Sequence, residues 1–538
     1  MPDWHFPYIM NLSILTARLL LILLISASQL SAANVLYNPG FESGGLGENQ
    51  NFPGWKTYGA NTYCETAIAG FPAHGGSNYL KVYQSFTGAL NYDGIYQDYI
   101  SGPGATYTAD GWMKTSSADS IAGQNLAWIE VSFRDANGNV LALYTTAKLG
   151  TNLIQSGTFP KDTWVHMQIT NNAGPSLIAP DGTYFVRYQV VVQGDAAYSG
   201  GSVFMDDLSL NPTGTAPYGN WNVVWDDEFN GTAVNTNFWT YDRGHGEEIT
   251  NSGWGNGELE YYTSRTNNAF VAGGLLHIVA RKENTNTIYG TFNFTSARMK
   301  TQGLASWKYG RFEWRARMPG GVGFWPALWF LGTDINTVVW PGCGEIDVTE
   351  NNSFVSGNVR GSLHCSYNDG ALTQPYDLPG GDSVTNFHTY TLDWATNSFL
   401  WYVDGRLYEI QTNWNGIAGN YPTPFDKPFF MLMNLAVGGN YTTNVPSSVI
   451  ASSGVFPADF QIDYVRVYNQ TQPLLLSVTH TNKNVTVSWP TNIVAHLQTQ
   501  VISNSSSPGS AWTDVVISTN PLRLMATNTG SFFRLTSP

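Results

Sequence analysis

Residues 344–350 read Gly-Glu-Ile-Asp-Val-Thr-Glu, and this stretch decides the fold and the site that the sequence predicts. Its apolar and β-branched members favour a strand. Side chains two positions apart share one face of a strand, so Glu345 and Asp347 point the same way, whereas plain alternation sends Glu350 to the opposite face. One extra residue near Val348 or Thr349, a β-bulge, would return Glu350 to the face of the other two. We therefore expect a bulged strand with three carboxylates on one face.

Three carboxylates on one concave face suit the cleavage of a sugar–sugar bond. A retaining glycosidase uses one carboxyl group as nucleophile and another as acid/base, about 5–5.5 Å apart. A straight strand would separate the Cα atoms of Glu345 and Glu350 by roughly 16 Å, so bulge, curvature and side-chain lean must close the gap. The alternative is an acidic edge strand that faces solvent. The upstream run 323–330, GFWPALWF, is too aromatic for a solvated edge and favours the first reading.

The stretch also resembles the bulged E-x-D-x-x-E motif of glycoside hydrolase family 16. Other blocks between Trp221 and Tyr468 occur in that family's order and resemble its laminarinase branch, the endo-β-1,3-glucanases. They are 253–262 (GWGNGELEYY), 296–299 (SARM), 310–313 (GRFE), 434–440 (NLAVGGN) and 463–468 (DYVRVY). The resemblance implies two curved antiparallel sheets with a glycan cleft on the concave face, in a retaining endo-glycosidase that acts on β-1,3-glucan or mixed β-1,3/1,4-glucan.

The resemblance also implies a role for each site residue. Glu345 would be the nucleophile, Glu350 the acid/base with a pKa raised by the neighbouring carboxylates, and Asp347 would orient the nucleophile. The implied substrate-binding residues are Trp325, Trp329, Asn256, Trp254, Arg298 and His364. Sugars stack on aromatic faces, and polar side chains meet their hydroxyl groups. Packing in the core is the alternative for the tryptophans, and a structural role is the alternative for His364.

No cofactor is expected for catalysis. The resemblance implies one structural Ca²⁺ on the face away from the cleft, held by the side chain of Asp463 and by the backbone carbonyls of Glu228 and Gly274. Oxygen donors of this kind suit calcium. The alternative is that Asp463 is a turn residue at the end of a strand.

Composition and charge narrow the classes of partner. Of 538 residues, 12% are charged and 14% are aromatic, which is typical of a β-rich extracellular protein. The net charge of −14 excludes nucleic acid as a partner, since such a protein needs a basic patch, and it weighs against sulfated polysaccharides. We expect a monomer whose partner is a β-glucan polysaccharide.

A secretory signal peptide is predicted for residues 1–33. The apolar run 19–25 follows Arg18 and precedes the small residues 31–33. It is shorter than the roughly 20 apolar residues of a membrane span, and no other stretch of the sequence could cross a membrane. We expect export to the extracellular space, the periplasm or the cell surface. Export permits a disulfide between Cys343 and Cys365, and two buried thiols are the alternative.

Residues 34–210 contain short alternating strands. The motifs NPGFE at 38–42 and DDLSL at 206–210 resemble carbohydrate-binding modules of the families 4, 9 and 22 type. That resemblance implies a β-sandwich and a calcium held by Glu42 with Asp206 or Asp207. The alternative is a β-sandwich spacer with no ligand. The module's tryptophans are predicted to be core residues rather than a binding platform: Trp55, Trp112, Trp128 and Trp164.

The remaining boundaries follow changes in composition. Residues 211–220 (NPTGTAPYGN) are typical of a linker, and the catalytic domain is predicted for 221–470. Its predicted strands are 275–280, 310–318, 345–350, 360–364, 387–394, 399–403 and 429–437. Many short strands without helices between them imply a sandwich or jelly roll. Residues 473–538 are predicted to form a small separate β-sandwich domain, with strands near 476–478, 484–490, 512–516 and 531–535.

Three functions are weighed. The first is an endo-β-1,3(4)-glucanase with an accessory glycan-binding module. The second is a related family 16 enzyme of the agarase or porphyranase type, acting on a marine galactan. The third is a non-catalytic β-glucan recognition protein, which we would expect to have lost a catalytic carboxylate. Both glutamates are present, and the blocks at 253–262 and 296–299 favour the first function.

Overall fold

The computed structural model describes residues 33–470 apart from 49–52, 60, 69, 151–159, 172–173, 198–199, 214–218, 367–371 and 454. Beyond residue 470 it describes six backbone strands. The predicted signal peptide, residues 1–33, falls almost wholly outside this range and stays a prediction. The described chain is all β, as expected, with one short α-helix, α2 (Ser447–Ser452), and four 3-10 turns. None of its helices has the length and apolar character that crossing a membrane requires.

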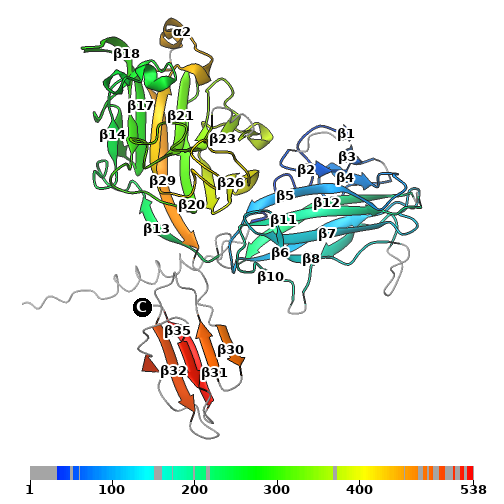
Figure 1. Ribbon diagram of the computed structural model, residues 1–538. Coiled ribbons are helices and arrows are strands. Elements are labelled where there is room, and N and C mark those ends of the chain that lie inside the picture. Colours follow the sequence, from blue (N-terminus) through cyan, green and yellow to red (C-terminus); the bar gives the residue numbers. More distant parts are fainter. Residues whose placement is uncertain are drawn as a thin grey trace, which may run out of the picture.

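Two sheets pack face to face in residues 221–470 (Figure 1). The sheet that carries residues 345–350 is called the site sheet below. Its strands, in spatial order, are β14 (Thr240–Asp242), β19 (Arg298–Lys300), β28 (Phe429–Val437), β21 (Phe324–Gly332), β22 (Glu345–Glu350), β23 (Asn358–His364) and β24 (Thr373–Asp377). β22 and β28 have the predicted bounds, and β22 pairs with β23 as an antiparallel hairpin.

The opposing sheet is called the back sheet. Its strands are β15 (Glu260–Tyr262), β18 (Gly290–Ser296), β17 (Leu275–Thr287), β29 (Ala458–Gln470), β20 (Gly310–Arg317), β25 (His388–Ala395), β26 (Ser398–Val403) and β27 (Arg406–Gln411), with β13 (Trp221–Asp227) beside β29 and β16 (Ala269–Ala272) beside β17.

One apolar core fills the space between these two sheets. Phe312 and Trp314 of β20 meet Phe330 of β21 edge-on, with ring centroids 4.9 and 5.7 Å apart. Burying large aromatic side chains on both inner faces drives the sheets together. β28 is buried on both faces, since Met431 and its alternate neighbours lie in this core, whereas Phe430 and Leu432 join a smaller apolar cluster on the opposite face.

Residues 34–210 form a second sandwich, as expected. One of its sheets contains β1 (Gly47–Glu48), β3 (Thr62–Thr66), β4 (Asn78–Tyr83), β12 (Ser202–Thr213), β6 (Thr106–Lys114), β10 (Leu177–Ile178) and β9 (Val165–Gln168). The other contains β2 (Lys56–Tyr58), β5 (Asn91–Ile100), β11 (Phe185–Gly194), β7 (Leu126–Arg134) and β8 (Val140–Thr145). β12 runs to Thr213, so the first residues of the predicted linker are strand.

The module and the catalytic domain share a sheet. Arg406 of β27 pairs with Tyr99 of β5, and the amide of Ile100 donates a 2.6 Å hydrogen bond to the carbonyl of Gly405. A fully buried ion pair lies close to this joint, between Arg311 and Asp393, with Arg311 also donating to the carbonyl of Ser101 in the module. Backbone pairing and a shared buried charge therefore fix one sandwich against the other.

Beyond residue 470 the backbone forms two three-stranded sheets, which fits the predicted C-terminal sandwich. The strands are β30 (Ser477–Thr481), β31 (Asn484–Ser488), β34 (Leu522–Met525), β33 (Thr513–Asp514), β32 (His496–Ile502) and β35 (Gly530–Thr536). β32 and β34 were not among the predicted strands.

Candidate active site

Val348 is the extra residue of a β-bulge in β22. Against β21, Thr349 pairs with Leu328 and Asp347 pairs with Trp329, so Val348 between them has no partner in that register. Against β23 the register shifts between Asp347 and Glu350, an interval that also contains Val348. The predicted bulge is therefore confirmed. The extra residue shifts the alternation of side chains by one step, so Glu350 at the end of β22 lies on the same face as Glu345 at its start.

The bulge separates the apolar and acidic residues of β22. Ile346 and Val348 lie in the core between the sheets. Glu345, Asp347 and Glu350 lie on the other face, where Asp347 is 2% exposed and Glu350 is 9% exposed. Ligand atoms of Glu345, Asp347 and His364 lie within 4.8 Å of one another, and no other three His, Cys, Asp or Glu side chains in the described part of the chain come together in this way.

Both glutamates are harder to ionise than ordinary carboxylic acids. The pKa of Glu345 and that of Glu350 are each raised to about 8, first by burial and then by the charge of Asp347. The raised pKa of Glu350 was predicted to come from repulsion by the neighbouring carboxylates. Repulsion does contribute, but burial contributes more. Nearby His364 lowers the pKa of both, whereas Arg298 lowers that of Glu345.

Trp325 and Trp329 of β21 share the acidic face, as their spacing predicts. Trp329 lies directly opposite Asp347, and the indole of Trp325 donates a 2.8 Å hydrogen bond to Glu350. Both side chains are half-buried and lie outside the main core, although Trp329 also packs against the smaller apolar cluster on this face. Trp329 is held by its own 2.7 Å hydrogen bond to Asn434.

Arg298 joins two of the predicted tryptophans. Its guanidinium carbon lies 4.7 Å from the ring centroid of Trp329 and 4.6 Å from that of Trp254. Asp242 of β14 holds the guanidinium at 3.0 Å. The Nε1 of Trp254 is buried without a hydrogen-bond partner among the described residues, so it remains a donor for a ligand. These three predicted residues thus lie together on the β19 side of β22.

His364 and Asn256 are also brought to the site. Nε2 of His364 lies 3.1 Å from Oδ2 of Asp347, so the histidine contacts a site carboxylate directly. The backbone carbonyl of Asn256 accepts a 2.7 Å hydrogen bond from Asn440. Asn440 begins a 3-10 turn, η4 (Asn440–Thr442), whose Tyr441 has its ring 5.1 Å from Trp325. Asn256 therefore lies at the rim beside Trp325.

Four further residues of this face were not predicted. Trp340 is 48% exposed, its ring lies 6.2 Å from that of His364, and it donates a hydrogen bond to Glu345. Arg360 of β23 lies over the ring of Tyr441, at 5.5 Å, near Glu350. Asn434 fixes Trp329 and lies in a block that carried the family resemblance. For Trp340, the available signal was a tryptophan in the loop just before the acidic strand.

The predicted calcium residues Glu228, Gly274 and Asp463 converge on one corner of the back sheet. Asp227 pairs with Val465 and Leu276 pairs with Ile462, so both partner strands end beside Asp463. The carboxylate of Asp463 contacts Arg315, and that of Glu228 pairs with Arg466. One carboxylate and two carbonyls would fit the oxygen donors that calcium takes. The metal stays a prediction.

The acidic residues predicted to bind calcium in the module also converge. Asp206 accepts hydrogen bonds from the amides of His74 and Gly75, and Glu42 accepts from the amides of Ser77 and Asn78. Burial raises the pKa of Asp206 to about 6. Asp207 contacts His74 at 2.6 Å. Backbone amides therefore already bind these carboxylates, and the calcium stays a prediction.

All four tryptophans of the module were predicted to be core residues, and one of them is. Trp55 is a core residue, as expected. Trp112 and Trp164 are half-buried outside the core, so that prediction was wrong for both. His74 stacks on Trp112 with ring centroids 3.9 Å apart, and this polar cover explains why a tryptophan can lie on that side of the strand. Trp128 is buried, but it lies on the face of β7 opposite the core.

Cys343 and Cys365 are two buried thiols and do not form a disulfide. Cys343 lies in the small apolar cluster on the site face, whereas Cys365 lies in the main core. Their side chains thus belong to different faces of one sheet, and a disulfide cannot join them without moving the backbone.

The chain is similar to several known proteins. The sequence model of the family "Glycosyl hydrolases family 16" matches residues 256–464. The beta-glucanase of Rhodothermus marinus is 39% identical over 281 residues, which cover 48% of this chain and 89% of that protein. Glucan endo-1,3-beta-glucosidase A1 of Niallia circulans is 36% identical over 303 residues, or 54% of this chain but only 44% of its own length. The solved endo-beta-1,3-glucanase of Pyrococcus furiosus is 40% identical over 46% of this chain and 94% of its own, with a TM-score of 0.43.

Proposed function

Because the chain belongs to glycosyl hydrolase family 16, we propose that it is an endo-acting, retaining hydrolase of β-1,3-glucan or mixed β-1,3/1,4-glucan. The observation that carries this proposal is the bulge at Val348, which puts Glu345, Asp347 and Glu350 on one face beside half-buried tryptophans. The names of the relatives, a beta-glucanase and an endo-1,3-beta-glucosidase, support a glucan substrate.

In the first step, a carboxylate oxygen of Glu345 attacks the anomeric carbon and forms an ester bond to the sugar. The bond to the glycosidic oxygen breaks, and Glu350 gives its proton to that oxygen. In the second step, Glu350 takes a proton from water, whose oxygen displaces Glu345 and restores the original anomeric configuration. Two displacements at one carbon give retention.

The surroundings of the two glutamates support this division of roles. The charge of Asp347 raises the pKa of both glutamates, since the three carboxyl groups are buried beside one another. Arg298 and the hydrogen bond from Trp340 favour the charged form of Glu345, which a nucleophile requires. Burial raises the pKa of both glutamates to about 8, so Glu350 can hold a proton at neutral pH, and the two roles are distinguished by the partners of each glutamate and not by this value. Asp347 lies beside the nucleophile and 3.1 Å from Nε2 of His364, and we assign it to positioning Glu345.

The substrate test uses laminarin, lichenan and agarose with the sizes of the products followed in time. We expect laminarin to break into oligosaccharides of many sizes within the first minutes, because an open cleft admits internal bonds. Lichenan cleavage would place mixed-linkage glucan within the substrate range. Cleavage of agarose alone would favour the galactanase alternative, and binding of laminarin without any products would favour the recognition protein.

The module is proposed to bind glycan through the face of its β5-β11-β7 sheet that points away from its core. Arg187 lies over the ring of Tyr96 at 3.8 Å, and Glu130 accepts hydrogen bonds from Gln189 and Trp128. Aromatic rings next to a polar network suit a sugar. Retention of the full chain on immobilised laminarin, weakened by Tyr96→Ala, would support this role.

Two further parts of the proposal concern stability and export. A structural calcium at Asp463, Glu228 and Gly274 would make the melting temperature fall on chelation and recover with added Ca²⁺, and an unchanged melting temperature would refute it. Export would remove the predicted signal peptide, so the mature chain should begin near Ala33 when its N-terminus is sequenced.

A further inference from the structure

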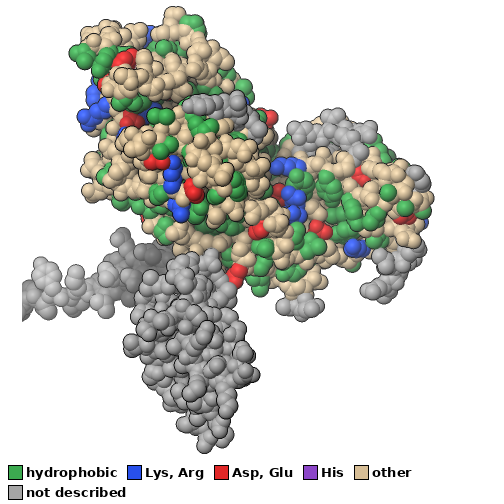
Figure 2. Space-filling model, viewed as in Figure 1, with side chains coloured by type: hydrophobic (Ala, Val, Ile, Leu, Met, Phe, Trp, Pro, Cys, Tyr) green, Lys and Arg blue, Asp and Glu red, His purple; other side chains and the backbone are tan. Residues whose placement is uncertain are grey.

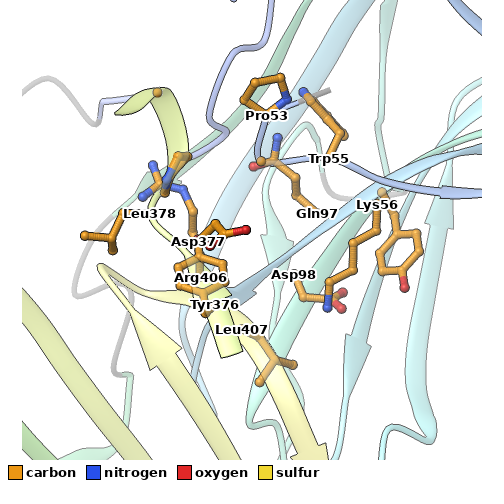
Figure 3. A pocket seen from close by; sticks show the side chains of 14 residues that line it. Pro53, Trp55, Lys56, Gln97, Asp98, Tyr376, Asp377, Leu378, Arg406 and Leu407 are labelled. Atoms are coloured by element: carbon orange, nitrogen blue, oxygen red, sulfur yellow. The ribbon is translucent and has the colours of Figure 1, made fainter. Parts of the chain in front are cut away.

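A cavity of about 280 Å³ lies between the module and the catalytic domain (Figure 3). The module contributes Lys56, Gln97 and Asp98 to its wall, and the catalytic domain contributes Asp377 and Arg406. Figure 3 shows these side chains approaching the cavity from two separate parts of the chain. The proposed catalytic site does not account for this space, and the proposed face of the module reaches it only at Tyr96 and Asp98.

The cavity is preformed, because the joint around it is rigid. Leu407 of the cavity wall belongs to an apolar cluster with Ile100 and Phe185 of the module. The strand pairing of Arg406 with Tyr99 and the amide bond from Ile100 to Gly405 lie next to it. A ligand that fills the space would therefore pay little conformational entropy to order its walls.

The lining suits an uncharged, hydroxyl-rich ligand. The lining has two cations, Lys56 and Arg406, and two carboxylates, Asp98 and Asp377, although the whole chain carries a net charge of −14. Asp98 is also ion-paired with Arg187 of the module at 2.7 Å, so the lining has no excess of negative charge. Figure 2 shows Lys and Arg side chains among acidic and apolar ones at the junction of the two lobes. The Nε of Arg406 is buried without a hydrogen-bond partner among the described residues, so it can donate to a ligand. Tyr96 adds an aromatic ring.

The cavity borders the site sheet. Asp377 ends β24, and its carboxylate accepts a 2.7 Å hydrogen bond from Asn358 of β23. Arg360, two residues further along β23, pairs with Glu350. Two strand spacings across the sheet and two residues along it place Asp377 roughly 12 Å from Glu350. Tyr96 and Asp98 also belong to the proposed glycan-binding face of the module, so the cavity lies between two glycan sites.

We infer that this cavity binds glucosyl residues of the same neutral β-glucan chain that occupies the cleft. The module and the catalytic domain then hold one chain together across their junction. The inference rests on the proposed function, since it takes its ligand from that substrate. It goes further by assigning a distal subsite to residues of both domains.

The test compares a long and a short substrate on the full chain. The double variant Lys56→Ala/Asp377→Ala removes one cation and one carboxylate from the cavity and keeps the net charge. Lys161→Ala/Asp181→Ala makes the same change at exposed turn positions of the module and is the matched control. We expect the cavity variant to raise the KM for laminarin about tenfold through lost hydrogen bonds, with kcat unchanged. Its kcat/KM for laminaritriose should equal that of the unaltered chain, because this substrate has at most two glucosyl units on one side of the cleaved bond and so stops short of the cavity.

Each result has one meaning. An unchanged KM for laminarin, or an equal loss on both substrates, overturns the inference while leaving the proposed hydrolase intact. A tenfold rise that the control double variant also shows overturns it as well, since the cavity would then not be the cause. If the unaltered chain releases no sugar from laminarin or lichenan, the proposed function fails and the inference fails with it.

Discussion

The indole nitrogen of Trp325 donates a 2.8 Å hydrogen bond to Oε1 of Glu350. Trp325 lies on β21 and Glu350 lies at the end of β22, two residues beyond the bulge at Val348. The bond orients the carboxyl group that we propose as the acid. It also favours the charged form of that group and so opposes the effect of burial on its pKa.

Trp325→Phe keeps an aromatic ring and removes this donor. The pKa of Glu350 should then rise further, because one influence that lowers it is lost. The alkaline limb of the kcat/KM profile on laminarin should move to higher pH, and the maximum should fall by roughly threefold to tenfold as the ring loses its anchor. An alkaline limb that stays in place would show that this bond does not tune the acid.

Glu350→Gln should make the protein more stable at pH 8 than the unaltered chain while abolishing hydrolysis. The pKa of Glu350 is raised when folded, so the stability that the protonated group contributes is complete below its ordinary pKa of 4.5 and is lost as the pH rises through about 8. Glutamine cannot ionise and escapes that loss. The melting temperatures should coincide near pH 4 and separate by a few degrees at pH 8.

The control for this experiment is Asp181→Asn, at an exposed turn, which should leave the pH dependence of melting unchanged. If Glu350→Gln melted below the unaltered chain at pH 8, the carboxylate would be a stabilising group and the assigned cause of its raised pKa would be wrong.

Thr349→Val should stabilise the protein by about 1 kcal/mol. Thr349 is fully buried next to the bulge, and its Oγ1 has no hydrogen-bond partner among the described residues. Replacing a buried, unsatisfied hydroxyl by a methyl group of the same shape removes its desolvation penalty. Urea unfolding measures the change. The matched variant Val348→Thr should destabilise instead, since it places a hydroxyl in the main core; equal effects of the two variants would contradict the bulge geometry.

The site residues that lie on strands could be predicted from the sequence better than those that lie in loops. The common face of Glu345 and Asp347 follows from local alternation, whereas the bulge that adds Glu350 was predicted because the chemistry needs all three carboxylates on one face. β28 was predicted to the residue because its run is apolar except for Asn434. Trp340 and Tyr441 were missed because loops reach the site only through the folded chain, which no local period encodes.

The module shows the same limit. Trp112 was predicted to be core because it lies in a strand-like stretch, but His74, which covers it, is 38 residues away in the sequence. The contact from Arg311 to the carbonyl of Ser101 spans 210 residues. Such long-range contacts decide which polar residues can be buried, and no local pattern of residues indicates that β5 pairs with β27.

Asp393→Asn should lower the free energy of unfolding by about 3–5 kcal/mol, because it leaves the buried charge of Arg311 without its counter-charge. Calorimetry and urea unfolding of the full chain measure the loss. The double variant Arg311→Met/Asp393→Leu removes both charges and should recover much of it. If the single variant were as stable as the unaltered chain, the ion pair would not stabilise the joint between the module and the catalytic domain.

The stereochemistry of the first product tests the central claim most directly. ¹H NMR can follow the anomeric signals during the first minutes of laminarin hydrolysis, before mutarotation mixes them. A mechanism with Glu345 as nucleophile and Glu350 as acid/base predicts that the β-anomer appears first and the α-anomer follows slowly. Initial appearance of the α-anomer would mean a single displacement by water, and it would contradict the double displacement derived from the bulged strand.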